Sequence, residues 1–263
     1  MDLGLTGKTV VVTGGSSGIG LATVKLALAE GANVAFCARG ADRLNRVRDD
    51  LAAAYGEARL LAKAFSVLEP EANTVFAQEV CARFGGCDAL ITNAGQGRVS
   101  TFADTSDTDW RDELELKIFS QLHPIRAFQD QLRASGTGSV TAVNSLLAYQ
   151  PEPHMVCTSA ARAGVQNLLK SLATELAPDI RVNSILIGLV DSQQWQRRFE
   201  ARPDQSQSRE AWFRDLAIKK NIPLQRLGHA AEAARALLFL SSPAASYVTG
   251  AKLELSGGVS RFI

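Results

Sequence analysis

The sequence of 263 residues is poor in the features that mark secreted, membrane-bound or metal-binding proteins. Its four cysteines form no Cys-x-x-Cys pair and its three histidines are scattered, so we expect neither disulfides nor a metal site. The chain has no basic and apolar start typical of a secretory signal, and no apolar run near the ~20 residues of a membrane helix. The formal net charge is only +1, so neither nucleic acid nor a membrane surface is an expected partner. These absences predict a soluble, cytoplasmic protein.

Internal repeats, low-complexity tracts and linkers are absent as well, which predicts one domain over residues 1–263. Hydrophobic residues make up 46% of the chain, enough for a large core. Strand-like and helix-like segments alternate throughout, which is typical of an α/β fold with a parallel sheet covered by helices on both faces. Strands are expected at residues 8–12, 33–38, 60–67, 88–92, 138–144, 180–186 and 251–255, and helices at 21–30, 41–54, 70–84, from 107 on, 156–176 and 230–240.

Two segments depart from this regular alternation. Pro124 falls inside the long predicted helix after residue 107 and is expected to kink it or break it locally. Residues 190–222 are polar with aromatic residues among the charges, and they fit a lid of short helices over a substrate cleft. The excess of basic over acidic side chains in this segment hints at an anionic substrate, although a solvated helix face explains it equally well.

A glycine-rich turn between a predicted strand and a predicted helix is the strongest local signal. Residues 13–20 read Thr-Gly-Gly-Ser-Ser-Gly-Ile-Gly. Glycines let backbone N–H groups approach a pyrophosphate closely, and the N-terminus of the following helix offers free amides to the same anion. Strand, glycine turn and helix together predict a dinucleotide site, although an ordinary turn has the same spacing by chance. The expected cofactor-binding residues are Gly14, Ser16, Ser17, Gly18, Ile19 and Gly20.

The end of the second predicted strand indicates which dinucleotide would bind. In such folds an acidic side chain there holds the ribose hydroxyls of NAD, whereas an arginine pairs with the 2′-phosphate of NADP. Here Ala38 stands at the acidic position and Arg39 follows it. A guanidinium matches the geometry of phosphate and keeps its charge near neutral pH. We therefore expect NADP(H), with a solvent-facing arginine at a turn as the alternative.

Further motifs follow the glycine turn in a fixed order along the chain. They are Asn93-Ala94-Gly95 after the fourth strand, Ile180-Arg181-Val182-Asn183 followed by Gly188, Val248-Thr249-Gly250, and Ser256-Gly257-Gly258. Together with residues 13–20, these motifs resemble those of the short-chain dehydrogenase/reductase family, of the type that includes 3-oxoacyl-acyl-carrier-protein reductases. The similarity covers nearly the whole chain.

The resemblance implies a single doubly wound, Rossmann-type sheet of about seven strands, and a homo-oligomer, either a tetramer or a dimer. It implies that Asn93, Ala94, Gly95 and Gly188 belong to the cofactor site. It also implies an adenine pocket in which Ser66 replaces the aspartate that the family usually has, so that adenine would be held less strongly.

The resemblance fails where the family has its catalytic tyrosine and lysine. The family uses a serine, a tyrosine thirteen residues later, a lysine four residues after that, and an asparagine on the long helix. The serine is present as Ser145, but Thr158, Arg162 and Lys117 occupy the other three positions, and no Tyr-x-x-x-Lys occurs in the sequence. Threonine is far less acidic than a phenol of pKa about 10, so it supplies little of the ~10²–10⁴-fold effect of a general acid. Arg162 would still bind the nicotinamide ribose, but it cannot give up a proton.

Three side chains are candidates for the missing proton donor. Lys117 would point toward the place where the asparagine acts in the family, and nearby Arg162 would lower its pKa because like charges oppose protonation. In this hypothesis Ser145 donates a hydrogen bond to the developing oxyanion. The alternative for Lys117 is a salt bridge. Tyr149 and His154 lie in the loop where substrate would sit, and each is either a substrate-binding group or an ordinary rim residue.

Two functions remain open from the sequence alone. The first is an NADP(H)-dependent oxidoreductase that transfers a hydride between the cofactor and a carbonyl or secondary alcohol, with a small-molecule carbonyl or acyl thioester as substrate. The second is a catalytically inactive NADP(H)-binding subunit or sensor, motivated by the loss of the tyrosine and lysine.

Overall fold

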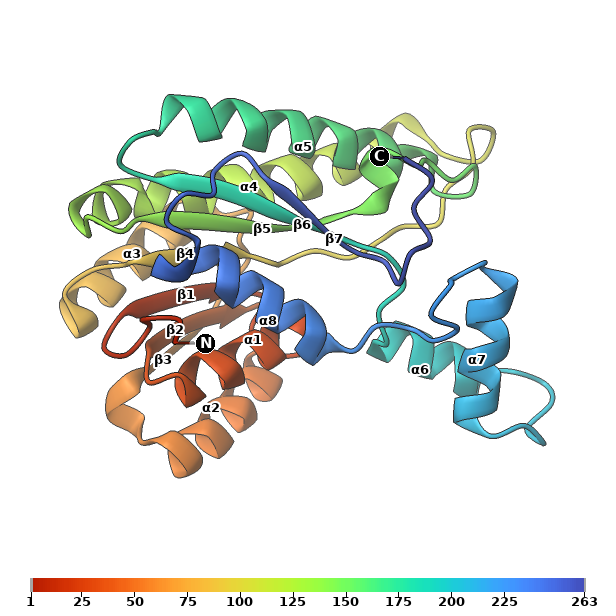
Figure 1. Cartoon of the computed structure of the whole chain (residues 1–263), viewed down its shortest axis with the longest axis horizontal. Coiled ribbons are helices and arrows are strands. Elements are labelled where there is room, and N and C mark those ends of the chain that lie inside the picture. Colours follow the sequence, from red (N-terminus) through yellow and green to blue (C-terminus); the bar gives the residue numbers. More distant parts are fainter. Residues whose placement is uncertain (1, 263) are drawn as a thin grey trace.

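A seven-stranded parallel sheet forms the middle layer of the molecule (Figure 1). The computed structural model describes residues 2–262, apart from the side chains of residues 193 and 194. The strands are arranged in the order β3-β2-β1-β4-β5-β6-β7, and all neighbouring pairs are parallel. Their bounds are β1 (Thr9–Thr13), β2 (Asn33–Ala38), β3 (Leu60–Ala64), β4 (Ala89–Thr92), β5 (Ser139–Ser145), β6 (Arg181–Ile187) and β7 (Lys252–Leu255). The predicted Rossmann-type α/β fold is confirmed.

The direction of chain travel across the sheet reverses between β1 and β4. Strands β1, β2 and β3 follow one another toward one edge, and β4 then pairs on the other side of β1. In open parallel sheets the crevice at the carboxyl ends of the strands beside such a reversal is the usual ligand site. The two strands at the reversal are fully buried, as expected for strands covered on both faces.

Helices cover both faces of the sheet and bury two separate apolar clusters. Helices α1 (Gly18–Ala29), α2 (Ala41–Tyr55) and α8 (Ala230–Ser241) pack on one face, and α3 (Pro70–Phe84), α4 (Asp107–Ala134) and α5 (Val156–Glu175) pack on the other. Alternate side chains of β1 enter the two clusters: Val10 and Val12 face α1 and α8, whereas Val11 faces the α3–α5 layer. No helix within residues 2–262 has an apolar stretch long enough to cross a membrane.

Most predicted boundaries agree closely with the structure, and three do not. Helix α1 begins at Gly18, three residues earlier than predicted, so the last glycines of the turn form its first turn. Strand β3 ends at Ala64 and not at residue 67, because its partner β2 ends at Ala38 and leaves no further backbone to pair with. Helix α4 is continuous through Pro124, so a local break is wrong, and the alternative, a kink at Pro124, stays a prediction. Pro124 is buried with Ile125 and Phe128, and this packing holds the helix across the missing hydrogen bond.

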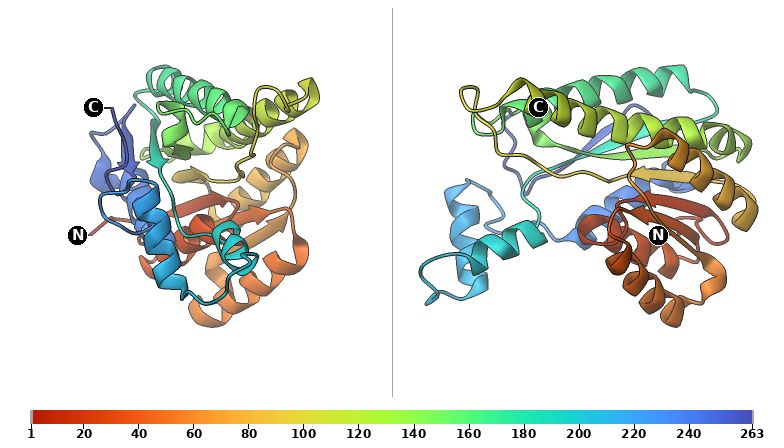
Figure 2. Two further views of the ribbon diagram at one scale, coloured as in Figure 1. Left: turned by 90° about the vertical axis from the view of Figure 1, so that its right-hand side faces the viewer. Right: turned by 180° about the vertical axis from the view of Figure 1, so that it is seen from behind.

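Residues 190–222 form two short helices, α6 (Gln193–Glu200) and α7 (Arg209–Lys219), beyond the carboxyl ends of the strands. Figure 2 shows them as an arm beside the main body. The arm has a small apolar cluster of its own, with Phe213 and Ala217 of α7 packed against Ile222 and Leu227. The predicted short helices are therefore present. Their action as a lid stays a prediction.

Candidate active site

An open cleft of about 930 Å³ runs along the carboxyl ends of the strands. Fourteen of the predicted site residues line it: Gly14, Ser16, Ser17, Gly18, Ile19, Arg39, Ser66, Asn93, Ala94, Gly95, Ser145, Thr158, Arg162 and Gly188. Gly20, Lys117, Tyr149 and His154 are outside this lining. The structure therefore brings nearly the whole predicted cofactor site into one cavity and continues it to three of the four predicted catalytic groups.

The glycine turn is shaped by backbone contacts with the end of β4. Gly14 and Gly18 have positive φ angles of 71° and 54°. A Cβ at Gly20 would lie 2.2 Å from the carbonyl oxygen of Gly14, so Gly20 allows helix α1 to pack closely on the turn and does not face the cleft. The side-chain amide of Asn93 donates hydrogen bonds to the carbonyl oxygens of Thr13 and Gly14, at 3.0 and 3.2 Å. Asn93 thus holds the turn in place.

The turn fits the pyrophosphate of a dinucleotide. The first four N–H groups of a helix lack partners within the helix, and the first turn of α1 contains no acidic side chain that would repel an anion. A Cβ at Gly18 would meet no atom within 4 Å, and Gly18 and Ile19 both line the cleft, so the start of α1 borders open space. Backbone amides and open space together match what a bound phosphate group needs.

Three arginines gather at the end of the cleft beside β2. Arg39, Arg43 and Arg46 all line it and all are exposed. The sequence analysis identified Arg39 and missed the other two. Their signal was the spacing of three residues between Arg43 and Arg46, which places both side chains on one face of α2, just after Arg39. Ser66 lines the same end, where its hydroxyl accepts a hydrogen bond from the backbone N–H of Leu68 at 3.3 Å.

Ser145, Thr158 and Arg162 line the opposite part of the cleft. Ser145 is the last residue of β5, and its hydroxyl donates to the carbonyl oxygen of Ile187 at 3.4 Å. Arg162 lies one turn after Thr158 on α5 and donates from Nη1 to the carbonyl oxygen of Val143 at 2.8 Å. The Nε of Arg162 is buried without a hydrogen-bond partner among the described residues. Burial lowers the pKa of Arg162 to about 10, and the charge of Glu113 opposes this shift.

Lys117 lies behind the cleft in a buried ion pair. Its side chain is 2% exposed, and Nζ is 2.8 Å from Oε1 of Glu113, which is 3% exposed. Nζ also donates to the carbonyl oxygen of Gln96 at 2.5 Å. The pKa of Lys117 is lowered as predicted, chiefly by burial and then by Arg162, whereas Glu113 raises it. The structure therefore places Lys117 in the salt bridge that was the alternative from the sequence, and the expected direct approach to the cleft does not occur.

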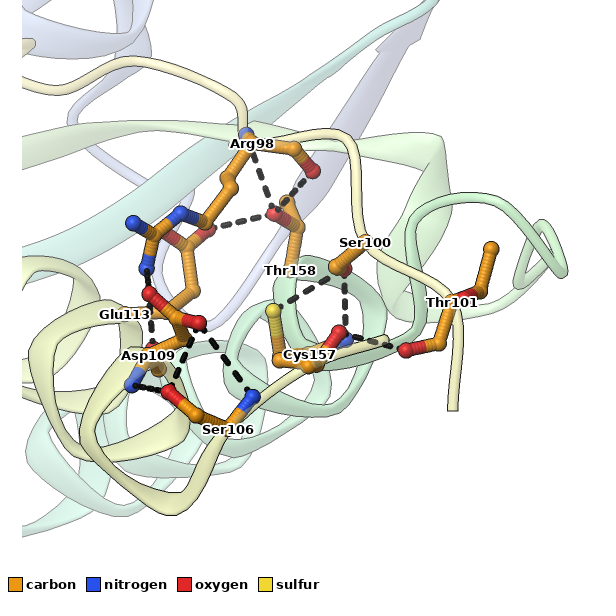
Figure 3. Close-up of polar contacts among 9 residues, drawn as sticks. Arg98, Ser100, Thr101, Ser106, Asp109, Glu113, Cys157 and Thr158 are labelled. Atoms are coloured by element: carbon orange, nitrogen blue, oxygen red, sulfur yellow. Dashed lines mark hydrogen bonds and ion pairs between the residues drawn. The ribbon is translucent and has the colours of Figure 1, made fainter. Parts of the chain in front are cut away.

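Glu113 also connects Lys117 to Thr158. Figure 3 shows the Thr158 hydroxyl directed at the Glu113 carboxylate and at the backbone of Arg98. The hydroxyl donates to Oε1 of Glu113 and accepts from the backbone N–H of Arg98 at 3.3 Å. The sequence analysis missed Glu113. Its position four residues before Lys117 on a helix was the signal that could have identified it.

Tyr149 and His154 lie outside the cleft. The ring of Tyr149 packs against Phe262, with the centroids 5.0 Å apart, and Nζ of Lys252 lies 3.7 Å from the Tyr149 ring centroid. The Nδ1 of His154 lies 3.7 Å from Glu152 on the surface. These contacts direct both side chains away from the predicted substrate position, so the structure gives them no direct contact with the cleft.

A comparison with known protein families shows to which family the chain belongs. The model of the family described as short chain dehydrogenase matches residues 8–203. The chain belongs to the short-chain dehydrogenase/reductase family. As a member of this family it is an NAD(P)-dependent oxidoreductase by type, and its catalytic centre is atypical because Thr158 and Arg162 replace the usual tyrosine and lysine.

Solved and curated relatives of this short-chain dehydrogenase/reductase span its whole length. A short-chain oxidoreductase of Pseudomonas aeruginosa, described as containing an atypical catalytic center, is 53% identical in its apo structure, with a TM-score of 0.96 and coverage of 98% of this chain and 99% of that one. Its NADPH-bound structure is 54% identical, with a TM-score of 0.92 and coverage of 97% and 98%. The L-sorbose reductase of Gluconobacter frateurii, complexed with NADPH and L-sorbose, is 32% identical, with a TM-score of 0.94 and full coverage of both chains. Among curated proteins, the acetoacetyl-CoA reductase of Synechocystis is 32% identical over 98% of each chain.

Proposed function

We propose that this protein is an NADP(H)-dependent reductase or dehydrogenase that interconverts a carbonyl and a secondary alcohol at a rearranged catalytic centre. The observation that carries the proposal is a single cleft that joins the glycine turn and its arginines to Ser145, Thr158 and Arg162. The substituted positions have kept hydroxyl and cationic groups, which are the groups that stabilise and protonate a developing oxyanion.

The arginines beside β2 support NADP(H) over NAD(H). A 2′-phosphate adds negative charge at this end of the cleft, where Arg39, Arg43 and Arg46 present guanidinium groups. They outnumber the one carboxylate beside them, Asp42, and the position at the end of β2 where NAD-binding folds have an acidic residue is Ala38. The NADPH-bound structure of the Pseudomonas aeruginosa relative supports the same choice. When bound, the cofactor supplies the hydride to the carbonyl carbon.

The chain's own groups orient and stabilise the carbonyl. Ser145, at the carboxyl end of β5, donates a hydrogen bond to the carbonyl oxygen of the substrate. To do so it gives up its long hydrogen bond to the carbonyl oxygen of Ile187. Arg162 lines the cleft, and its buried Nε has no hydrogen-bond partner among the described residues, so we assign its guanidinium to the nicotinamide ribose. Because Arg162 is held by Val143 and cannot give up its proton near neutral pH, it stabilises negative charge without acting as the acid.

A small carbonyl compound or an acyl thioester is the substrate class that we propose. The cleft is open and its rim includes Trp195 of α6, so a long substrate can extend toward the arm. Arg197 and Arg198 are exposed on the same helix and would favour a substrate with an anionic end. One of the relatives is named an acetoacetyl-CoA reductase, and acetoacetyl-CoA is an acyl thioester.

The second candidate function is an inactive NADP(H)-binding subunit or sensor. It is favoured by the direction of the Thr158 hydroxyl, which bonds to Glu113 and Arg98 behind the cleft. In this case the cofactor would bind and would control conformation or assembly.

One experiment separates the two candidates. NADPH binding is measured by calorimetry, and NADPH oxidation is then followed with a panel of ketones, sugars and 3-oxoacyl thioesters. We expect saturable binding of NADPH and turnover of at least one substrate class above the rate without protein. Binding without any turnover, together with turnover gained by the double variant Thr158→Tyr/Arg162→Lys, would support the sensor. Absence of NADPH binding would contradict both.

A further inference from the structure

Glu113, Lys117 and Thr158 form a continuous hydrogen-bonded chain that ends at the cleft. Glu113 and Lys117 lie one turn apart on α4, and Thr158 lies in the first turn of α5. Oε1 of Glu113 pairs with the ammonium of Lys117 and also accepts a hydrogen bond from the hydroxyl of Thr158. Of these three residues, only Thr158 lines the cleft. The ammonium of Lys117 also donates to the backbone carbonyl of Gln96, which lines the cleft, but a carbonyl oxygen has no proton to pass on. Glu113 and Thr158 therefore provide the route along which a proton can move.

The charges around Glu113 come from three elements. Lys117 pairs with it on α4, Arg162 acts on it from α5, and Cys157 of α5 lies near Lys117. The segment between β4 and α4 contributes the backbone of Arg98, whose guanidinium pairs with Asp109 at 2.8 Å. Two cations thus share one buried carboxylate, and this surplus of positive charge favours release of a proton from Lys117.

Burial of an ion pair is not explained by stability alone. Well-packed apolar side chains of similar volume often serve as well in such a position, because removing two charges from water costs more than their attraction returns. Here the pair is almost completely buried, and its carboxylate is also bonded to a side chain at the wall of the cleft. An ion pair can exchange a proton with the Thr158 hydroxyl, which two apolar side chains in the same place could not do.

We propose that Glu113 is a positioning residue that connects Lys117 to Thr158 in a buried proton path, so that the proton given to the substrate oxygen originates on the Lys117 ammonium. This inference rests on the proposed reductase function. With NADPH bound and a hydride supplied to the carbonyl carbon, the Thr158 hydroxyl would turn from Glu113 to the substrate, its O–H bond would break and its proton would pass to the substrate oxygen. In the same relay Lys117 would give a proton to the Glu113 carboxylate, and Glu113 would give one to the Thr158 oxygen. NADP⁺, the alcohol and a neutral Lys117 amine result, and water returns a proton to Lys117 after product release.

The test is a double-mutant cycle on Glu113 and Thr158, with the reduction rate and NADPH affinity measured for every variant. Glu113→Gln and Thr158→Val should each lower the rate by about 10²-fold, the lower end of the effect of a general acid, and leave NADPH affinity unchanged. The double variant should lose no more than either single one, because both changes interrupt the same path. Thr158→Ser, which restores the hydroxyl, should recover most of the loss. Glu115→Gln is the matched control, since Glu115 is exposed two residues away on α4.

Each outcome decides between a proton path and a structural role. Losses that multiply in the double variant, or a Thr158→Val variant as fast as the wild type, would overturn the path while leaving the reductase function intact. If Glu113→Gln does not fold, the same cycle with Lys117→Met and Thr158→Val answers the question by the same criterion. A wild-type protein that binds NADPH and reduces no substrate would refute the proposed function itself, and the proton path with it.

Discussion

The glycine-turn region, residues 9–39, and the catalytic region, residues 113–162, are built from different parts of the chain. The first relies on backbone: positive φ angles at Gly14 and Gly18, and amides at the start of α1. The second relies on side chains from α4, β5 and α5 that meet behind and along the cleft. The backbone-built region has kept the family's pattern, whereas the side-chain-built region has changed at three positions.

This difference explains why residues of the glycine turn cannot be replaced, whereas residues of the catalytic region can be replaced together with their partners. A Cβ at Gly20 would lie only 2.2 Å from the carbonyl oxygen of Gly14, so no other residue fits at this position and the glycine is retained. A catalytic side chain can be exchanged if its partners change with it, as Glu113, Lys117 and Thr158 bond to one another. Reversion of Lys117 alone to asparagine would leave the buried carboxylate of Glu113 without its ammonium partner, which is strongly destabilising.

The largest expected effect is in the catalytic region. Ser145→Ala should lower the reduction rate by about 10²–10³-fold, because it removes a hydrogen-bond donor to the developing oxyanion. NADPH affinity should stay unchanged, since Ser145 does not contribute to the glycine turn. Steady-state kinetics and calorimetry on the same preparation measure both quantities. An equal loss of affinity and rate would contradict the separation of the two regions.

The next effect is in the glycine-turn region. Gly20→Ala should weaken NADPH binding by about 10–100-fold, because the added Cβ forces apart α1 and the turn at a typical overpacking cost of ~1–3 kcal/mol. The matched control is Gly164→Ala on α5, where the new Cβ would meet no atom within 4 Å and which does not line the cleft. Calorimetric titration with NADPH should separate the two variants. Equal affinities would show that the close approach at Gly20 is not needed.

A smaller effect tests the choice of cofactor. Arg39→Ala should weaken NADPH binding by about 10-fold, the lower range for a hydrogen bond to a charged group, and leave NADH binding unchanged. Arg48→Ala serves as the control, because Arg48 lies on the following helix α2, pairs with Asp49 and does not line the cleft. A similar loss for both cofactors after Arg39→Ala would contradict a contact with the 2′-phosphate.

The smallest effect is a change in pH dependence. Burial and Arg162 lower the pKa of Lys117 from 10.5. A proton donor is active below its pKa, so the reduction rate should fall as the pH rises through a value below 10.5. Lys117→Met should abolish this fall, and the oxidation direction of the wild type should show the opposite slope. A reduction profile identical in the two proteins would remove Lys117 from the proton path.

Local signals in the sequence were sufficient for the sheet, the glycine turn and the end of the cleft beside β2. Gly14 to Gly20 and Arg39 could be located because a turn, a helix N-terminus and a strand end are each set by adjacent residues. The same reasoning identified the substituted positions Thr158 and Arg162, because their places follow from spacing along β5 and α5.

The sequence by itself determined which groups are present at each position of the family's pattern, and with them the fold and most of the lining of the cleft. Only the tertiary structure decided that Lys117 turns from the cleft to Glu113, and that Glu113 bonds to Thr158, which is 45 residues further along the chain. The physical reason is that a buried charge takes the partner that packing places beside it. Which partner that is depends on how α4 and α5 meet, and no single stretch of sequence contains this information.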